Sequence, residues 1–180
     1  LNLFVSSMLI LVLVDNLVLM YLGWVGVGLC SYLLIGFWYE EKQNGDAARK
    51  AFIVTRVGDT AMAIGLFMLF DIFETLNIQD IVTQAPQVWS VGSETAVVIA
   101  LLLLGGAVGK SAQLPLQTWL PDAMAGPSPV SALIHAATMV TAGVYLIARV
   151  HIIFELAPIA QHCVGIIGAV TLLLAGFSAL

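Results

Sequence analysis

Long uninterrupted apolar runs constrain this chain more than any other feature. Runs of roughly 20 apolar residues recur along its 180 residues, and each could cross about 30 Å of hydrocarbon as a helix. Because lipid offers the backbone no hydrogen bonds, only a helix bundle or a closed barrel can span a bilayer. The runs are continuous rather than alternating, which favours helices. With 61% hydrophobic and 9% charged residues, the composition is not that of a soluble globular protein. We therefore predict an all-α polytopic membrane helix bundle.

The pattern predicts about six transmembrane helices, one of them broken. Their expected ranges are 1–14, 17–38, 51–70, 95–114, 130–148 and 163–180, with polar connections at 40–50 and 71–94. Trp24, Trp38 and Tyr39 are predicted to anchor the second helix at the membrane interface. Because the chain begins and ends inside apolar runs, we expect residues 1–180 to be a single membrane domain, truncated at both ends from a longer protein.

Lys110 is the charge that this pattern explains least well. Residues 111–125 contain one acid, Asp122, and no further base, so Lys110 lacks the basic cluster of an ordinary helix end. A charge at bilayer depth costs about 3 kcal/mol or more, which makes it a candidate functional group. If the helix continues, Gln113 and Gln117 share its face and provide a polar lining. The alternative is a lysine that extends to the interface along its aliphatic chain.

The segment after Lys110 cannot form one unbroken helix. Proline removes a backbone donor and disfavours helical geometry in the preceding residue. The residues that break the pattern are Pro115, Pro121, Gly126, Pro127 and Pro129. Two interpretations stay open: a helix break inside the membrane, as at transporter ion sites, or a plain loop at 115–129. Before the break, Gly105, Gly106 and Gly109 allow either close helix approach or entry of water.

Two further polar groups lie within predicted helices. Ser131, His135 and Thr138 form a stripe at helical spacing, and histidine suits proton relay because it titrates near neutral pH. A lone histidine can equally be a hydrogen-bonded packing residue. Arg56 and Asp59 are three residues apart, so they can form an ion pair. That pair is either self-neutralised or shifts the field at a neighbouring proton site, and spacing does not separate the two.

Several other functions are disfavoured. Two cysteines, Cys30 and Cys163, are too few for a cysteine-ligated iron–sulfur cluster. The Gly-Lys-Ser at 109–111 lacks the first glycine of a phosphate-binding loop, because position 104 is Leu104. Haem would need paired histidines, and His135 is alone at depth. We expect no cofactor in this chain, and its net charge of -5 predicts no nucleic-acid partner.

The residues around Lys110 carry a resemblance. Residues 109–145 read GKSAQLPLQTWLPDAMAGPSPVSALIHAATMVTAGVY, and they are preceded by LGW at 22–24, GVGLCSY at 26–32 and VTRVGD at 54–59. This pattern resembles the antiporter-like, proton-pumping membrane subunits of respiratory complex I, among them its large distal subunit. Multi-subunit cation/proton antiporters share the signature and remain an alternative. A structural subunit that has lost transport is a third interpretation.

The resemblance implies a function and a setting. It implies one of two inverted repeats of five helices, with Lys110 on a broken helix, His135 as a relay, and Arg56 and Asp59 tuning the central site. The function would be proton translocation coupled to NADH:quinone electron transfer, as a non-redox subunit of that enzyme. NADH and quinone would be bound elsewhere in the complex. The partners would be other membrane-arm subunits and the lipid of a bacterial inner or mitochondrial inner membrane.

One departure from the family pattern matters for this mechanism. The family has a glutamate in Leu-Gly-Trp-Glu-Gly-Val-Gly, where this chain has Val25. That glutamate is the expected partner of the lysine, so its role does not transfer to Val25. We expect either a variant impaired in pumping or a chain in which Asp59 serves as the counter-charge to Lys110.

Overall fold

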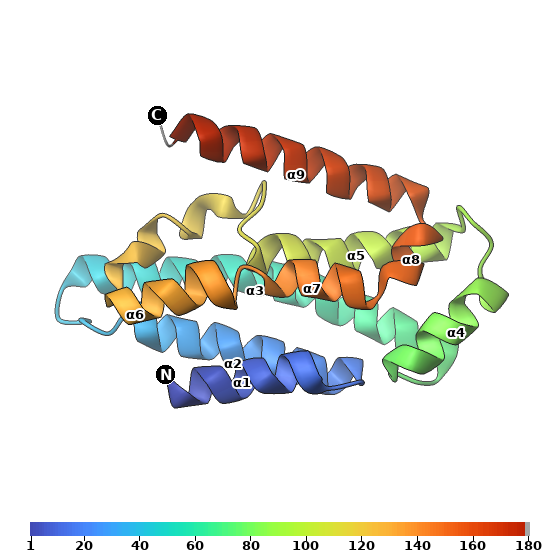
Figure 1. Cartoon of the computed structure of the whole chain (residues 1–180), viewed down its shortest axis with the longest axis horizontal. Helices are drawn as coiled ribbons and strands as arrows, with labels where there is room; N and C mark the ends of the chain where they lie inside the picture. Colours follow the sequence, from blue (N-terminus) through green and yellow to red (C-terminus); the bar gives the residue numbers. More distant parts are fainter. Residues whose placement is uncertain (179–180) are drawn as a thin grey trace.

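The computed structural model describes residues 1–178, and the side chains of residues 135–137 lie outside that description. The chain is an all-α bundle, as predicted. Each of the six predicted segments contains a helix that runs along the long axis of the bundle (Figure 1). The elements are α1 (Asn2–Leu13), α2 (Leu17–Ile35), α3 (Lys42–Phe73), α4 (Ile78–Val88), α5 (Glu94–Lys110), η1 (Gln117–Trp119), η2 (Asp122–Ala125), α6 (Ser128–Ser131), η3 (Ala132–Ala137), α7 (Ala142–Arg149), α8 (His151–Glu155) and α9 (Pro158–Ser178).

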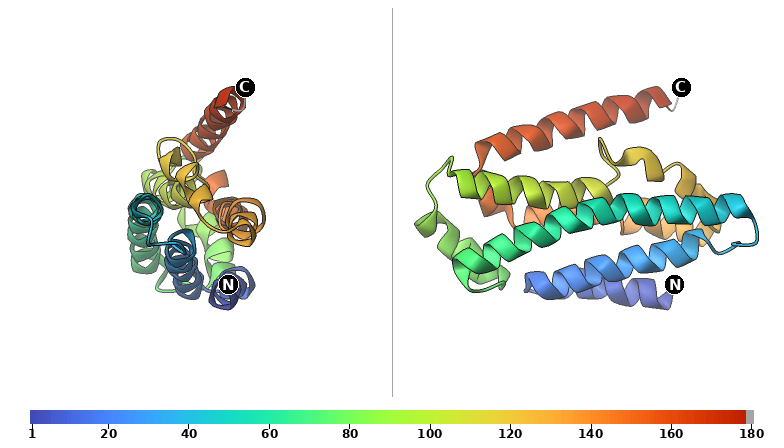
Figure 2. Two further views of the ribbon diagram at one scale, coloured as in Figure 1. Left: turned by 90° about the vertical axis from the view of Figure 1, so that its left-hand side faces the viewer. Right: turned by 180° about the vertical axis from the view of Figure 1, so that it is seen from behind.

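α3 is longer than the sequence predicted. It begins at Lys42 rather than at residue 51, so most of the expected polar connection at 40–50 is helical. Alanine, lysine, arginine and glutamine all favour helix, and Ala47 and Ala48 are buried on the inner face. With 32 residues, α3 is about 48 Å long. It runs through the bundle and supplies one wall of its centre (Figure 2).

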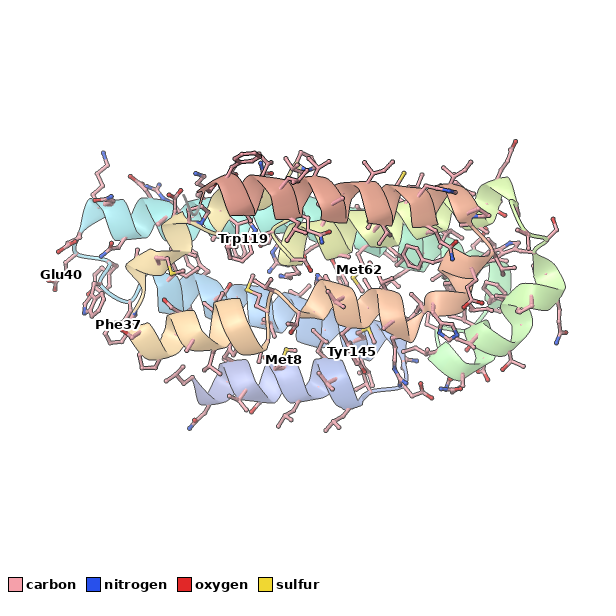
Figure 3. The ribbon with its side chains drawn as sticks, turned by 45° about the horizontal axis from the view of Figure 1, so that its top comes forward. Met8, Phe37, Glu40, Met62, Trp119 and Tyr145 are labelled. Atoms are coloured by element: carbon pink, nitrogen blue, oxygen red, sulfur yellow. The ribbon has the colours of Figure 1, made fainter. Side chains whose placement is uncertain are left out.

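The predicted helix break is confirmed. α5 ends at Lys110 rather than at residue 114, and the chain continues through two short 3₁₀ turns, η1 and η2. Trp119 and Ala123 of these turns are buried in the core, so residues 115–129 are not a plain surface loop. Figure 3 shows Trp119 directed into the bundle, and Met8 and Tyr145 between α1 and α7. The fifth predicted span is also interrupted, because η3 is a π-helical turn between α6 and α7.

The surface of the bundle is that of a membrane protein. α2, α3 and α9 are each long and apolar enough to cross a bilayer. Large apolar side chains such as Phe67 and Leu172 are about three-quarters exposed, as lipid-facing side chains would be. α9 stands apart from the other helices in the end-on view (Figure 2), and within it Ala160 is the residue that the structure buries.

The predicted interface anchors divide into two groups. Trp38 and Tyr39 are exposed at the end of the bundle, beside Phe37 and Glu40 (Figure 3), which fits an interfacial position. The prediction for Trp24 is wrong, because its side chain is fully buried in the middle of the bundle. Its indole N–H has a buried partner there, which removes the reason for it to seek the interface.

Candidate functional site

A seam of glycines brings α3 and α5 into backbone contact. A Cβ placed on Gly58 would lie 2.8 Å from the carbonyl oxygen of Gly105 and 3.1 Å from the Cα of Gly109. A Cβ on Gly106 would lie 2.7 Å from the Cβ of Met62. Small residues allow such close approach between membrane helices. Of the two interpretations of the glycines before Lys110, the structure shows close helix approach.

Because α3 and α5 pack closely along this seam, Lys110 lies at the centre of the molecule. Lys110 is the last residue of α5, its side chain is 1% exposed, and its Nζ lies 3.5 Å from Oδ2 of Asp59. Asp59 lies near the middle of α3, so the ammonium sits at mid-bundle rather than at an end. The carbonyls at the end of α5 are the negative pole of its helix dipole, which favours a cation there. The interpretation of Lys110 as a residue extending to the interface is wrong.

Asp59 contacts every other polar group described at this site. Its Oδ2 also lies 3.4 Å from Nη1 of Arg56, which confirms that these two residues pair. Its Oδ1 accepts a hydrogen bond of 2.8 Å from Nε1 of Trp24. The hydroxyl of Tyr21 donates to the backbone carbonyl of Asp59 at 3.2 Å. One buried carboxylate therefore faces two cations and one neutral donor.

α2 supplies the third wall of this site. A Cβ on Gly28 would lie 2.7 Å from Nζ of Lys110, so the missing side chain of that glycine makes room for the ammonium. Val25 is half-buried and lies one turn before Gly28, where a longer acidic side chain would be a neighbour of Lys110. Asp59, rather than a residue of α2, occupies the counter-charge position in this chain.

The other predicted site residues are not gathered around Lys110 in the expected way. Because α5 ends at Lys110, Gln113 lies in the following turn, half-buried, and the predicted helical face with Gln117 does not exist. Thr138 is half-buried and its hydroxyl donates to the carbonyl of Leu133 at 2.7 Å. Ser131 is half-buried at the end of α6.

The π turn changes the expected stripe at Ser131, His135 and Thr138. A π turn has i→i+5 bonds, so residues three and four apart no longer align as they do on an α-helix. The predicted α-helical spacing of the stripe is therefore wrong. The side chain of His135 lies outside the described residues, and its relay role stays a prediction.

The described residues offer no cluster of three or more His, Cys, Asp or Glu side chains that could hold a metal ion. Cys30 and Cys163 are free thiols. The site's chemistry within the described part of the chain is therefore that of one amine, one guanidinium and one carboxylate in a closely packed apolar setting. Such a set can hold, release and regain a proton.

Three residues of the site were not predicted from the sequence. Tyr21 and Trp24 both contact Asp59, and Gly28 adjoins Lys110. The signal was their spacing, because positions 21, 24 and 28 lie on one face of a helix. Two hydrogen-bonding aromatic side chains and a glycine on one face of a helix indicate that this face packs against a polar group of a neighbouring helix.

Comparison with known proteins places the chain in a family. The transmembrane family described as NADH:quinone oxidoreductase/Mrp antiporter matches residues 14–180. The chain is 69% identical over 179 residues to NADH-quinone oxidoreductase subunit L of Pseudomonas aeruginosa, and 66% identical over 179 residues to the protein of that name in Escherichia coli K12. Each alignment covers 99% of this chain and 29% of the relative, so the chain spans under a third of their length. With its family pattern matched over nearly every residue, this chain belongs to the NADH:quinone oxidoreductase/Mrp antiporter transmembrane family.

Proposed function

We propose that the chain is part of a membrane-arm subunit of a proton-translocating NADH:quinone oxidoreductase, respiratory complex I. The names of its relatives support this assignment. The single observation that carries it is the fully buried ammonium of Lys110 at mid-bundle, opposite Asp59. The subunit itself carries no redox step. NADH and quinone bind elsewhere in the complex, the partners are the other membrane-arm subunits, and the relatives' bacterial sources favour a bacterial inner membrane over a mitochondrial one.

The charges of the site explain how it would handle a proton. Among the described side chains around Lys110, two cations face one carboxylate, which leaves one positive charge in excess. Release of one proton from Lys110 removes that excess and leaves the Arg56–Asp59 pair balanced. Uptake of a proton restores the charged ammonium, whose nearest counter-charge is Oδ2 of Asp59. Electrical changes elsewhere in the complex would move the site between these two states.

Val25 makes Asp59 the centre of this proposal. With the family's glutamate, two carboxylates would face two cations, whereas here Asp59 serves both. We infer that proton transfer in this chain depends on Asp59 more strongly than in a chain with the glutamate. We also infer that its coupling to electron transfer is weakened. His135, Ser131, Thr138 and Gln113 would form the onward polar route.

The test uses the complete complex in sealed vesicles. The protons moved per NADH oxidised are measured for the parent and for Lys110→Met, which keeps most of the length of the side chain and removes the charge. We expect the ratio to fall by at least the share that this subunit contributes. Lys50→Met is the matched control, because Lys50 is half-exposed at the end of the bundle. An unchanged ratio in an assembled Lys110→Met complex overturns the proposal.

The family description also names Mrp antiporters, and this favours a second candidate. As a subunit of a cation/proton antiporter, the chain would work without electron input. Sodium- or potassium-driven pH changes in vesicles lacking NADH would establish that function. A purely structural subunit is the third candidate, motivated by Val25. Indifference to both Lys110→Met and Val25→Glu would support it.

A further inference from the structure

Trp24 contacts both members of the central ion pair. Its side chain is fully buried in α2, and Nε1 donates to Oδ1 of Asp59 at 2.8 Å. The Nζ of Lys110 lies 5.9 Å from the centre of the indole ring, at the outer range of a cation–π contact.

The two oxygens of Asp59 have different partners. Oδ1 accepts from Trp24, while Oδ2 lies 3.4 Å from Arg56 and 3.5 Å from Lys110. A strong charge-assisted hydrogen bond is about 2.7–2.9 Å, so neither cation holds Oδ2 tightly. The indole bond is the short one. The orientation of the carboxylate is therefore fixed from the α2 side, and its second oxygen is left between the two cations.

Among the described side chains, the charged and titratable groups that contact Asp59 are Arg56 on its own helix, Lys110 from α5 and Tyr21 from α2. Tyr21 donates to the backbone carbonyl, not to the carboxylate. The indole N–H does not titrate, so it remains a donor whether Lys110 is charged or neutral. A donor of this kind holds the carboxylate in place through the whole proton cycle.

We propose that Trp24 is a positioning residue, whose indole N–H holds Oδ1 of Asp59 so that Oδ2 faces Lys110 and Arg56. This inference rests on the proposed function for its transport readout, but the Trp24–Asp59 bond itself can be tested separately. Without the N–H, the carboxylate can rotate away from Lys110. Proton transfer by Lys110 then lacks a counter-charge held at a fixed position.

The test compares Trp24→Phe with Trp89→Phe in the complete complex. Trp89 is also buried, but it packs edge-on against Phe73, about 21 Å along α3 from Asp59. Two quantities are measured: the protons moved per NADH, and the frequency of the infrared carboxyl band that Asp59→Asn removes. In Trp24→Phe, Oδ1 of Asp59 loses its donor, so we expect the band to shift in frequency and the protons moved per NADH to fall. Trp89→Phe should change neither quantity, and Trp24→His, which keeps a ring N–H, should show a smaller band shift than Trp24→Phe.

Each outcome decides the proposal. An assembled Trp24→Phe complex with an unmoved band overturns it. A moved band supports the positioning role even if Lys110→Met leaves transport unchanged, and that combination overturns the proposed function alone. If Trp24→Phe fails to assemble, 3-benzothienyl-alanine at position 24 keeps the ring shape and replaces the N–H by sulfur. A band shift with that residue supports the proposal, and an unshifted band overturns it.

Discussion

Two lysine–aspartate pairs in this chain show that the distance between the charges does not determine how much the loss of one partner costs. Lys50 and Asp122 lie 2.6 Å apart with side chains 44% and 45% exposed. Lys110 and Asp59 are farther apart, at 3.5 Å, but their side chains are 1% and 2% exposed. Loss of one partner should cost more at the buried pair, about 3–5 kcal/mol, than at the exposed pair, which contributes about 0–1 kcal/mol. Burial decides what the loss of one partner costs.

The surroundings of the two pairs explain this difference. Lys50 and Asp122 border an open polar hollow of about 480 Å³ between the start of α3 and η2, so water can replace either partner. The buried pair is closed in by the glycine seam of α3 and α5 on one side and by α2 on the other. A charge there can be compensated only by another protein group or by loss of a proton.

Removal of the buried acid should have the largest effect. Asp59→Ala leaves the ammonium of Lys110 without its counter-charge, and we expect a loss of about 3–5 kcal/mol in the stability of the subunit. Thermal unfolding of the purified complex and the amount of assembled subunit measure it. The double variant Asp59→Ala/Lys110→Met should recover most of the loss, since it removes both charges. Additive losses in the double variant would show that the pair is not coupled.

Addition of a second acid sharpens the comparison from the opposite side. Val25→Glu places a carboxylate one turn before Gly28, beside the ammonium. The second acid would give Lys110 a counter-charge that it does not share with Arg56, so we expect the protons moved per NADH to rise above the parent value. Val25→Gln is the matched control with no charge, and equal proton transport in the two variants would contradict the counter-charge argument.

Interference with the glycine seam tests whether packing creates the buried pair. Gly58→Ala places a methyl group 2.8 Å from the carbonyl oxygen of Gly105. Because that oxygen belongs to the backbone, only a shift of the backbone can relieve the clash. We expect a cost of about 1–3 kcal/mol and lower proton transport. Gly45→Ala, in the same helix, meets no atom within 4 Å and should be neutral or stabilising by up to about 1 kcal/mol. Equal melting temperatures for the two variants would show that the seam tolerates separation.

The exposed pair should give the smallest effect. We expect Lys50→Ala to change stability by at most about 1 kcal/mol, and the difference from the parent to vanish in about 1 M salt, where charges are screened beyond about 3 Å. Melting curves at low and high salt measure this. A loss as large as that of Asp59→Ala would contradict the distinction between the two pairs.

Part of this site followed from local sequence. The position of Lys110 within an apolar run predicted its burial, and the three-residue spacing of Arg56 and Asp59 predicted their pairing. The glycines before Lys110 allowed close helix approach as one of two interpretations, and the structure shows it. Each of these rests on the composition of a run or on spacing along one helix, which local sequence determines.

The contacts between helices did not follow in the same way. Asp59 and Lys110 belong to different helices, and their register depends on how the seam packs. α5 ends at Lys110, before the predicted end at residue 114, and Ala112 adopts a left-handed conformation (φ 49°) that does not continue the helix toward Pro115. Trp24 was assigned to the interface because tryptophan is common there, and only its partner on α3 explains its burial.

The hydroxyl of Thr171, on α9, accepts a hydrogen bond of 3.2 Å from the backbone N–H of Leu114. α9 is otherwise loosely held, yet this contact fastens it to the segment that follows the end of α5. A tilt of α9 would therefore pull directly on the peptide chain leading away from Lys110. Movement of α9, the outermost helix of the described chain, would thus be passed through this hydrogen bond to the segment next to the buried Lys110.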